Sequence, residues 1–145
     1  MDPFRKMVSL LLKQDRGARG EEVRPMVERW SHSRPNACYN NAFLYASERP
    51  GCRYVLGYLF VGGSVPIEHA WVWDPKRGHL EVTLPTIAGD RWVEMHRPGM
   101  RWCLDFAMEA GYPPAAHEYR RAKQQGAKVN EGFRAIPSLA EFLRS

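Results

Sequence analysis

Residues 53–61 read RYVLGYLFV, and this run of aliphatic, aromatic and β-branched side chains predicts a strand buried on at least one face. Gly62-Gly63-Ser64 predicts a turn directly after it. Two further strands are predicted over residues 67–73 and 79–84, joined by a hairpin loop at 74–78. Strands joined by such short connections pair in opposite directions, so we expect an antiparallel sheet.

A helix is predicted immediately before this sheet. It starts near Asn36 or Ala37 and ends before Pro50-Gly51. At helical spacing, positions 38, 42 and 45 share one face and positions 39, 43 and 46 share another, and these positions are apolar or aromatic. One helix followed by three consecutive strands is typical of an α+β domain, with the helix packed on a small antiparallel sheet.

The segments on either side of this unit predict additional flanking helices. Asp2-Pro3 combines a capping residue with proline at the first helical position, which predicts a helix to about Lys13. The remaining patterns predict a short helix over 21–30, a strand over 91–95, helices over 100–110 and 115–125, and a final helix opened by the capping box at 138–141. We therefore expect a single domain over 1–145, composed of an N-terminal helical flank (1–35), a candidate catalytic core (36–84) and a C-terminal flank (85–145).

The charge of the chain is uneven along its length. The 145 residues carry a formal net charge of +5, which by itself favours a nucleic-acid or membrane binder. The basic excess lies in residues 1–34 and 101–145, whereas residues 35–100 are neutral. Nucleic-acid binding is therefore possible through the flanks but not favoured. The basic run at 120–123 suits a solvated helix face, an acidic protein surface or nucleic acid.

Cysteine usage and hydropathy exclude several further classes. Apolar runs stay well below the about 20 residues of a membrane span, and the short run at 7–12 is followed by Lys13, unlike a secretory signal. The three cysteines have no CxxC spacing, which disfavours a disulfide framework or a zinc finger. We expect a cytoplasmic protein. We expect it to hold no metal or cofactor, because the residues that could bind a metal include no closely spaced pair; these residues are Cys38, Cys52, His69 and His79.

Cys38 is the first candidate for chemistry. It opens the predicted helix, where backbone N–H groups and the helix dipole favour a thiolate. A small buried cysteine is the alternative. Cys52 and Cys103 are expected to be structural, with Cys52 the more exposed of these two.

His69 is the second candidate, because it lies on the sheet that follows the helix holding Cys38. A Cys–His pair works when the imidazole takes the thiol proton and returns it to the leaving group. A core histidine held by hydrogen bonds is the alternative interpretation of His69.

A third group should orient the imidazole, and Glu81 is the candidate. If the hairpin loop spans 74–78, Trp73 faces His79 and Glu81 shares a sheet face with His69; a loop over 75–78 turns Glu81 away. Asp74, which suits a turn residue before proline, and Glu94 are the rival carboxylates.

Two asparagines and one tryptophan are the remaining candidate site residues. An oxyanion hole would use the backbone N–H of Cys38 with Asn36 or Asn41, although Asn36 also suits a helix cap. Trp71 and Trp73 project to one face of their strand, which suits core positions or, for Trp71, a wall of a substrate cleft beside His69.

Four blocks of this sequence resemble a group of small phage and bacterial proteins similar to the papain-like and transglutaminase-like cysteine enzymes. The blocks are C-Y-N-N-A (38–42), Y-V-L-G-Y (54–58), P-I-E-H-A-W (66–71) and E-V-T (81–83). The resemblance implies Cys38 as nucleophile, His69 as base and Glu81 in the position that is usually Asp.

The residues and the resemblance together predict a cysteine-dependent acyl-transfer enzyme acting on a protein or peptide. Peptide hydrolysis, deamidation and transamidation all remain open. The alternative is a non-catalytic, phage-type accessory protein that binds a host protein or nucleic acid through its basic flanks.

Overall fold

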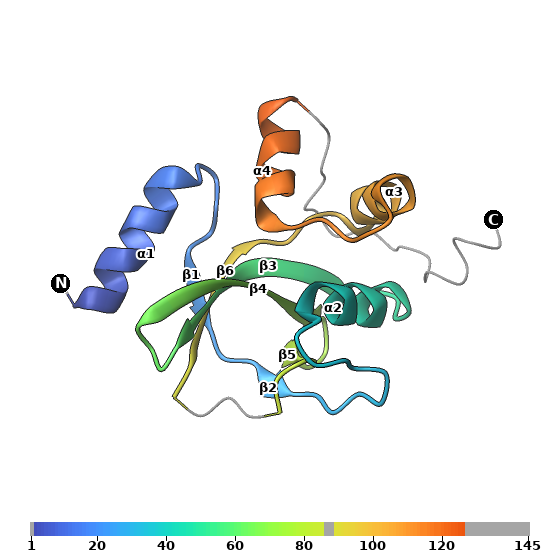
Figure 1. The fold of residues 1–145 in the computed structure, drawn as a ribbon, viewed down its shortest axis with the longest axis horizontal. Helices are drawn as coiled ribbons and strands as arrows, with labels where there is room; N and C mark the ends of the chain where they lie inside the picture. Colours follow the sequence, from blue (N-terminus) through green and yellow to red (C-terminus); the bar gives the residue numbers. More distant parts are fainter. Residues whose placement is uncertain (1, 86–88, 127–145) are drawn as a thin grey trace.

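A six-stranded, curled sheet forms the centre of the protein (Figure 1). The computed structural model describes residues 2–85 and 89–126. The strand order is β1-β6-β3-β4-β5-β2, and every neighbouring pair is antiparallel except the parallel pair of β2 and β5. The strands are β1 (Glu21–Val23), β2 (Met26–Val27), β3 (Arg53–Val61), β4 (Val65–Asp74), β5 (Gly78–Glu81) and β6 (Arg91–His96). The chain is therefore an α+β protein, and the antiparallel pairing predicted for its three consecutive strands is confirmed.

The N-terminal flank differs from the sequence prediction of a second short helix over residues 21–30. Instead, β1 and β2 occupy this segment, on either side of Pro25, and extend opposite edges of the sheet. Sheet edges expose unpaired N–H and C=O groups, and pairing with them outweighs a weak local preference for helix. Val23 lies opposite Trp92 in the register and packs against the cluster that contains Trp92.

The described residues contain four helices that pack on the sheet: α1 (Pro3–Gln14), α2 (Cys38–Ser47), α3 (Met100–Ala110) and α4 (Ala116–Gln124). Asp2 caps α1 as predicted, because its carboxylate accepts a hydrogen bond from the Arg5 N–H at 2.9 Å. All four helices lie within two residues of their predicted bounds. The helix predicted to open at 138–141 lies outside the described residues. None of the described helices is long and apolar enough to cross a membrane.

One face of the sheet is covered by helices. The largest apolar cluster joins Ala42 and Phe43 of α2 to Tyr54, Leu56 and Val72 of β3 and β4, and it extends to α3 and α4. A smaller cluster packs α1 against β3 and β6. Together, these contacts fix the start of α2 over the middle strands, as Figure 1 shows.

Side chains on alternate positions of β4 point to the opposite face. Trp71 packs there with Val55 and Leu59 of β3 and with Trp92 of β6. In the pairing of β4 with β5, Trp73 lies opposite His79, which is the register predicted for a hairpin loop over 74–78. This register places His69 and Glu81 on the same face of adjacent strands.

Gly57 allows this face to pack closely. It lies opposite His69 in the β3–β4 register, next to a bulge in the pairing of β3 with β6. A Cβ atom at this position would lie 2.1 Å from the carbonyl oxygen of Val93 and 2.6 Å from the Trp71 ring. The missing side chain therefore leaves the space that the Trp71 indole occupies.

Gly57→Ala is expected to lower the free energy of unfolding by about 1–3 kcal/mol, because backbone and a fully buried indole must both shift. Ser64→Ala, in the exposed turn of the same hairpin, is the control and should change the value by less than about 0.5 kcal/mol. Chemical denaturation followed by tryptophan fluorescence measures both. Equal stability of the two variants would contradict the close packing around Gly57.

Candidate functional site

Three elements that are distant in sequence bring the predicted residues together. Cys38 is the first residue of α2, His69 lies within β4, and Glu81 is the last residue of β5. The three side chains differ in accessibility: Cys38 is partly exposed, His69 is 5% exposed and Glu81 is fully buried. Solvent therefore reaches the thiol but not the carboxylate.

A short hydrogen bond joins the histidine to the acid. His69 Nε2 lies 2.6 Å from Glu81 Oε1. Burial by itself would lower the pKa of His69, but hydrogen bonds with Cys38 and Glu81 and the charge of Glu81 outweigh it and raise the pKa to about 9. The bond to Glu81 therefore favours the protonated form of His69.

The thiol of Cys38 lies near the same imidazole. Hydrogen bonding with Cys38 is among the causes that raise the pKa of His69. Glu81 bonds to Nε2 of the ring. The three side chains predicted from the sequence therefore lie in one neighbourhood.

Glu81 is held by more than the histidine. Its Oε1 also accepts a hydrogen bond from the Trp92 indole N–H at 3.0 Å, and its Oε2 accepts the backbone N–H groups of Thr83 and Leu84 at 3.0 and 3.2 Å. Burial alone would raise the pKa of Glu81, but these donors and His69 lower it. The carboxylate is thus kept ionised and fixed in orientation.

Trp92 is a site residue that sequence reasoning missed. It lies on β6, which is separated from β5 by β3 and β4 in the sheet order, and only the curl of the sheet brings its indole to Glu81. The alternation of RWVEMH (91–96) indicated a strand. No local pattern indicates which buried carboxylate its indole meets.

The rival carboxylates are engaged elsewhere. Asp74 accepts the backbone N–H groups of Lys76 and Arg77 at 2.7 and 3.2 Å, which is the turn role considered for it. Glu94 forms a two-point ion pair with Arg97, at 2.9 Å for each bond. Among the three carboxylates considered, Glu81 is the one that bonds to His69.

The pKa of a second histidine on this face, His79, shifts in the opposite direction because its nearest carboxylate is paired with an arginine. His79 lies 3.6 Å from Glu94, which is already paired with Arg97, and it accepts a hydrogen bond from the Trp71 indole at 2.9 Å. Burial lowers the pKa of His79 to about 4, with Arg97 adding to the effect and Glu94 opposing it. The neutral form is therefore favoured at His79, whereas the charged form is favoured at His69.

The start of α2 lacks a side-chain cap. Its N-cap residue is Ala37, which cannot accept a hydrogen bond through its side chain. Asn36 is exposed, has a left-handed backbone with φ of 59°, and does not cap the helix. The backbone N–H of Cys38, in the first turn, has no intrahelical acceptor and remains available to an anion.

The side chain of Asn41 is committed to structure. Its carbonyl oxygen accepts the Arg34 N–H at 3.0 Å, and its amide nitrogen donates to the Arg34 carbonyl at 2.8 Å, to the Ser33 hydroxyl at 3.2 Å and to the Thr83 hydroxyl at 3.0 Å. Both groups of the amide are occupied. Asn41 anchors the loop before α2, and we do not assign it to an oxyanion hole.

Trp71 and the other two cysteines are core residues. Trp71 is fully buried and stacks at 6.1 Å from the His69 ring, so it supports the histidine from within the core and does not line a cleft. Cys52 is 2% exposed, contrary to the expectation that it would be the more exposed structural cysteine, because it packs in the cluster beneath α2. Cys103 is fully buried in the same cluster.

The basic run on α4 is partly engaged within the protein. Arg120 lies 3.6 Å from the carboxylate of Asp15, and the Lys123 ammonium lies 5.3 Å from the centre of the Tyr119 ring. The contact of Arg120 with Asp15 joins α4 to the residue that ends α1, whereas the contact of Lys123 lies within α4. Among the described residues, no group of three or more His, Cys, Asp and Glu side chains is arranged to hold a metal ion.

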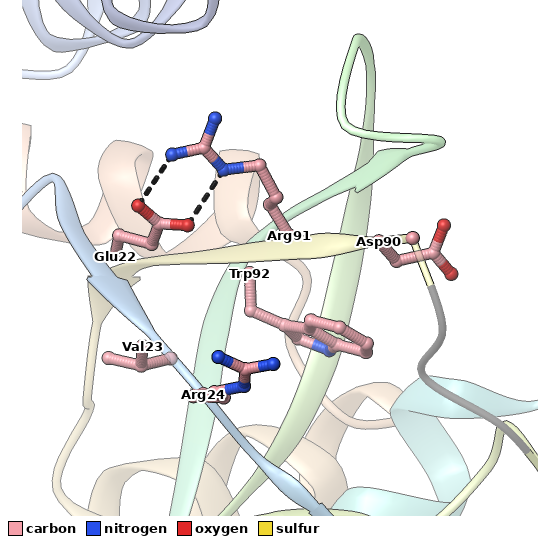
Figure 2. A pocket seen from close by; sticks show the side chains of 7 residues that line it. Glu22, Val23, Arg24, Asp90, Arg91 and Trp92 are labelled. Carbon is pink, nitrogen blue, oxygen red and sulfur yellow. Dashed lines mark hydrogen bonds and ion pairs between the residues drawn. The ribbon is translucent and has the colours of Figure 1, made fainter.

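A cavity of about 670 Å³ lies along β1 and β6 (Figure 2). Glu22 and Arg91 form a two-point ion pair on its wall, at 2.7 and 2.8 Å. Trp92 also lines the cavity, while its indole N–H reaches Glu81. Trp92 therefore separates this cavity from the acid of the candidate site.

Comparison with known proteins gives the chain no relative. No family model, no curated protein and no solved structure matches it. Any functional conclusion therefore rests on the geometry of the site.

Asn41→Ala is expected to lower the free energy of unfolding by about 1–3 kcal/mol, because it leaves the polar groups of the 33–34 loop without partners. The matched control is Asn40→Ala, an exposed asparagine in the same helical turn, which should change the value by less than about 0.5 kcal/mol. Urea denaturation of the two variants tests this. A neutral Asn41→Ala would show that the loop is anchored by other contacts.

Proposed function

We propose that this chain is a cysteine-dependent acyl-transfer enzyme acting on a carboxamide or peptide carbonyl of a protein or peptide substrate. Cys38 is the nucleophile, His69 transfers the proton, and Glu81 orients and charges His69. The observation that carries the proposal is the 2.6 Å hydrogen bond between His69 and the buried Glu81, with Cys38 near enough to raise the pKa of the same histidine.

The burial of the Glu81 carboxylate requires specific partners. A fully buried carboxylate costs several kcal/mol unless donors surround it, and here donors occupy both oxygens and hold the histidine in a fixed orientation. A perturbed histidine beside a partly exposed thiol is typical of a reactive cysteine. The order of Cys, His and acid along the chain is also that of the papain-like and transglutaminase-like enzymes that the sequence blocks resemble.

The proposed reaction has two halves. In the resting pair His69 carries the proton and Cys38 is the thiolate; the Cys38 sulfur forms a bond to the carbonyl carbon, and the oxyanion is held by the backbone N–H of Cys38. The C–N bond then breaks, the His69 imidazolium gives its proton to the departing amine or ammonia, and a thioester remains on Cys38. Water attacks the thioester and gives a proton to His69, and the C–S bond breaks, which releases the acid and restores the thiolate–imidazolium pair.

The second substrate decides the net reaction. Water yields peptide hydrolysis or deamidation, and an amine in its place yields transamidation. Glu81 stays ionised throughout, since its role is to stabilise the imidazolium and hold the ring.

Cys38 is expected to react with iodoacetamide at pH 7 about tenfold faster than an ordinary cysteine thiol, because an imidazolium beside it favours the thiolate. In this test the sulfur bonds to the methylene carbon and iodide leaves. His69→Ala should remove the advantage, and His117→Ala, an exposed histidine on α4, should retain it. Mass spectrometry of the modified peptides separates Cys38 from Cys52, where burial raises the thiol pKa to about 11. Equal rates for wild type and His69→Ala would overturn the proposal.

The pH dependence of acyl transfer follows from His69. Its pKa is raised to about 9, so the imidazolium persists below this value and is lost as pH rises through it. Turnover of a peptide amide should therefore fall above about pH 9, where the leaving group loses its acid. Glu81→Gln should move this alkaline limb to lower pH, because the carboxylate raises the pKa of His69. An unchanged limb in Glu81→Gln would contradict the role of Glu81.

Trp92→Phe is expected to slow Cys38 alkylation and acyl transfer by up to about tenfold, because one of the donors that hold Glu81 is lost. It should also raise the pH at which activity appears on the acid side, since the indole N–H lowers the pKa of Glu81. Trp73→Phe, on the same face of the sheet, is the control. A Trp92→Phe profile that matches wild type would show that the indole only fills space.

A further inference from the structure

A smaller cavity, of about 290 Å³, lies between the ends of α1 and α4. Figure 1 shows the C-terminal end of α1 turned toward α4 on the same side of the sheet. The volume is at the small end of the range of pockets that hold ligands, about 300–1,000 Å³, so the cavity suits a compact group. Four cations line it, two from the end of α1 and the residues after it and two from α4: Lys13, Arg16, Arg120 and Lys123.

The cavity brings the two basic flanks of the chain together. Lys13 and Arg16 belong to the N-terminal flank, whereas Arg120 and Lys123 belong to the C-terminal flank. Gly17, which has a left-handed backbone with φ of 83°, turns the chain toward α4, and a Cβ atom at this position would lie 3.4 Å from Lys123 Nζ. The fold therefore gathers in one place positive charge that the sequence distributes over both ends.

The one carboxylate in the wall is already bonded within the protein. The side chain of Asp15 is 3% exposed, and its Oδ2 lies 2.8 Å from His96 Nε2. Lys13 and Arg16, in contrast, are exposed, and none of the ion pairs among the described residues involves either of them. Two cations therefore border the cavity without an acidic side chain as partner.

The helix ends reduce the positive charge of the cavity but do not cancel it. α1 and α4 both end there, and each helix C-terminus carries about half a negative charge. Such ends attract lysine and arginine, which accounts for part of the basic lining. Four cations, set against Asp15 and about one unit of charge from the two helix ends, leave an excess of about two positive charges. The cavity is thus suited to a dianion.

A phosphate monoester has the charge and the acceptors that this lining requires. It carries about −1.5 to −2 at pH 7 and offers three strong acceptor oxygens. Guanidinium groups pair with these oxygens at two points, and ammonium groups act as point charges. A carboxylate carries a single charge, and the charges of a nucleic-acid backbone are single and spread along the strand. One compact cavity with several cations therefore favours the monoester.

We propose that the cavity between α1 and α4 binds the terminal phosphate monoester of a small molecule. Arg16 and Arg120 pair with the phosphate oxygens, and Lys13 and Lys123 supply further positive charge. Cys38 does not line this cavity, so the binding site is independent of the proposed acyl transfer.

Calorimetric titration of the full chain with phenyl phosphate, in a buffer free of phosphate, tests the proposal. Saturable binding at a single site is expected, with inorganic phosphate as a competitor. Phenyl sulfate has nearly the same shape but one negative charge, and it should bind at least about fivefold more weakly because the lining is matched to a dianion.

Two variants at exposed positions assign the binding to the cavity. Arg16→Gln should weaken phenyl phosphate binding at least about tenfold, and Lys13→Gln several-fold, because each removes a cation from the wall. Neither change breaks an ion pair among the described residues, so the fold should be retained. The matched control is Lys6→Gln, at an exposed lysine of α1 about 10 Å from Lys13 along the helix axis, which should change the affinity less than about twofold.

Four results would overturn the site. The first is the absence of saturable phenyl phosphate binding, and the second is equal affinity for phenyl sulfate. The third is a loss in Lys6→Gln as large as that in Arg16→Gln, which would indicate a response to net charge alone. The fourth is tighter binding of a short oligothymidylate with unphosphorylated ends that Arg16→Gln weakens, since this would assign the cavity to a nucleic-acid backbone.

Discussion

The hydrogen bond between His69 and the buried carboxylate of Glu81 is the constraint on which the rest of the site depends. An ionised carboxylate with no exposed surface is stable only if donors surround it, and four donors do so: His69, the indole of Trp92, and the backbone N–H groups of Thr83 and Leu84. These donors come from β4, β6 and the segment after β5. The position of one charge therefore fixes the register of β4 on β5 and the curl that brings β6 over them.

The register of β4 on β5 was predictable because strand alternation allows Glu81 only two positions, on the same sheet face as His69 or on the opposite one. A hairpin loop over 74–78 puts His69 and Glu81 on one face, and the observed pair of Trp73 with His79 is the one that this loop requires. The helix beginning at Cys38 was also predictable, since apolar spacing and the Pro50-Gly51 stop are local signals. Such features depend on neighbours within a few residues.

Features that depend on distant partners were not predictable. Residues 21–30 carry no strong strand signal and become β1 and β2 because they meet the free edges of β6 and β5. Asn41 looked equally suited to an oxyanion hole, and only its contacts with Arg34 and Thr83 show that its amide is fully used. The opposite pKa shifts of His69 and His79 depend on whether the nearest carboxylate is shared with an arginine, which the sequence does not reveal.

Asn41 also links the segment before α2 to the acid of the candidate site. It binds the backbone of Arg34 and donates to the hydroxyl of Thr83. The N–H of Thr83 in turn donates to Glu81, which bonds to His69. Hydrogen bonds through Asn41 and Thr83 therefore connect the loop before α2 to the buried carboxylate. Because these links are between buried or partly buried groups, the same contacts position the start of α2, where Cys38 lies, and the pair of His69 and Glu81.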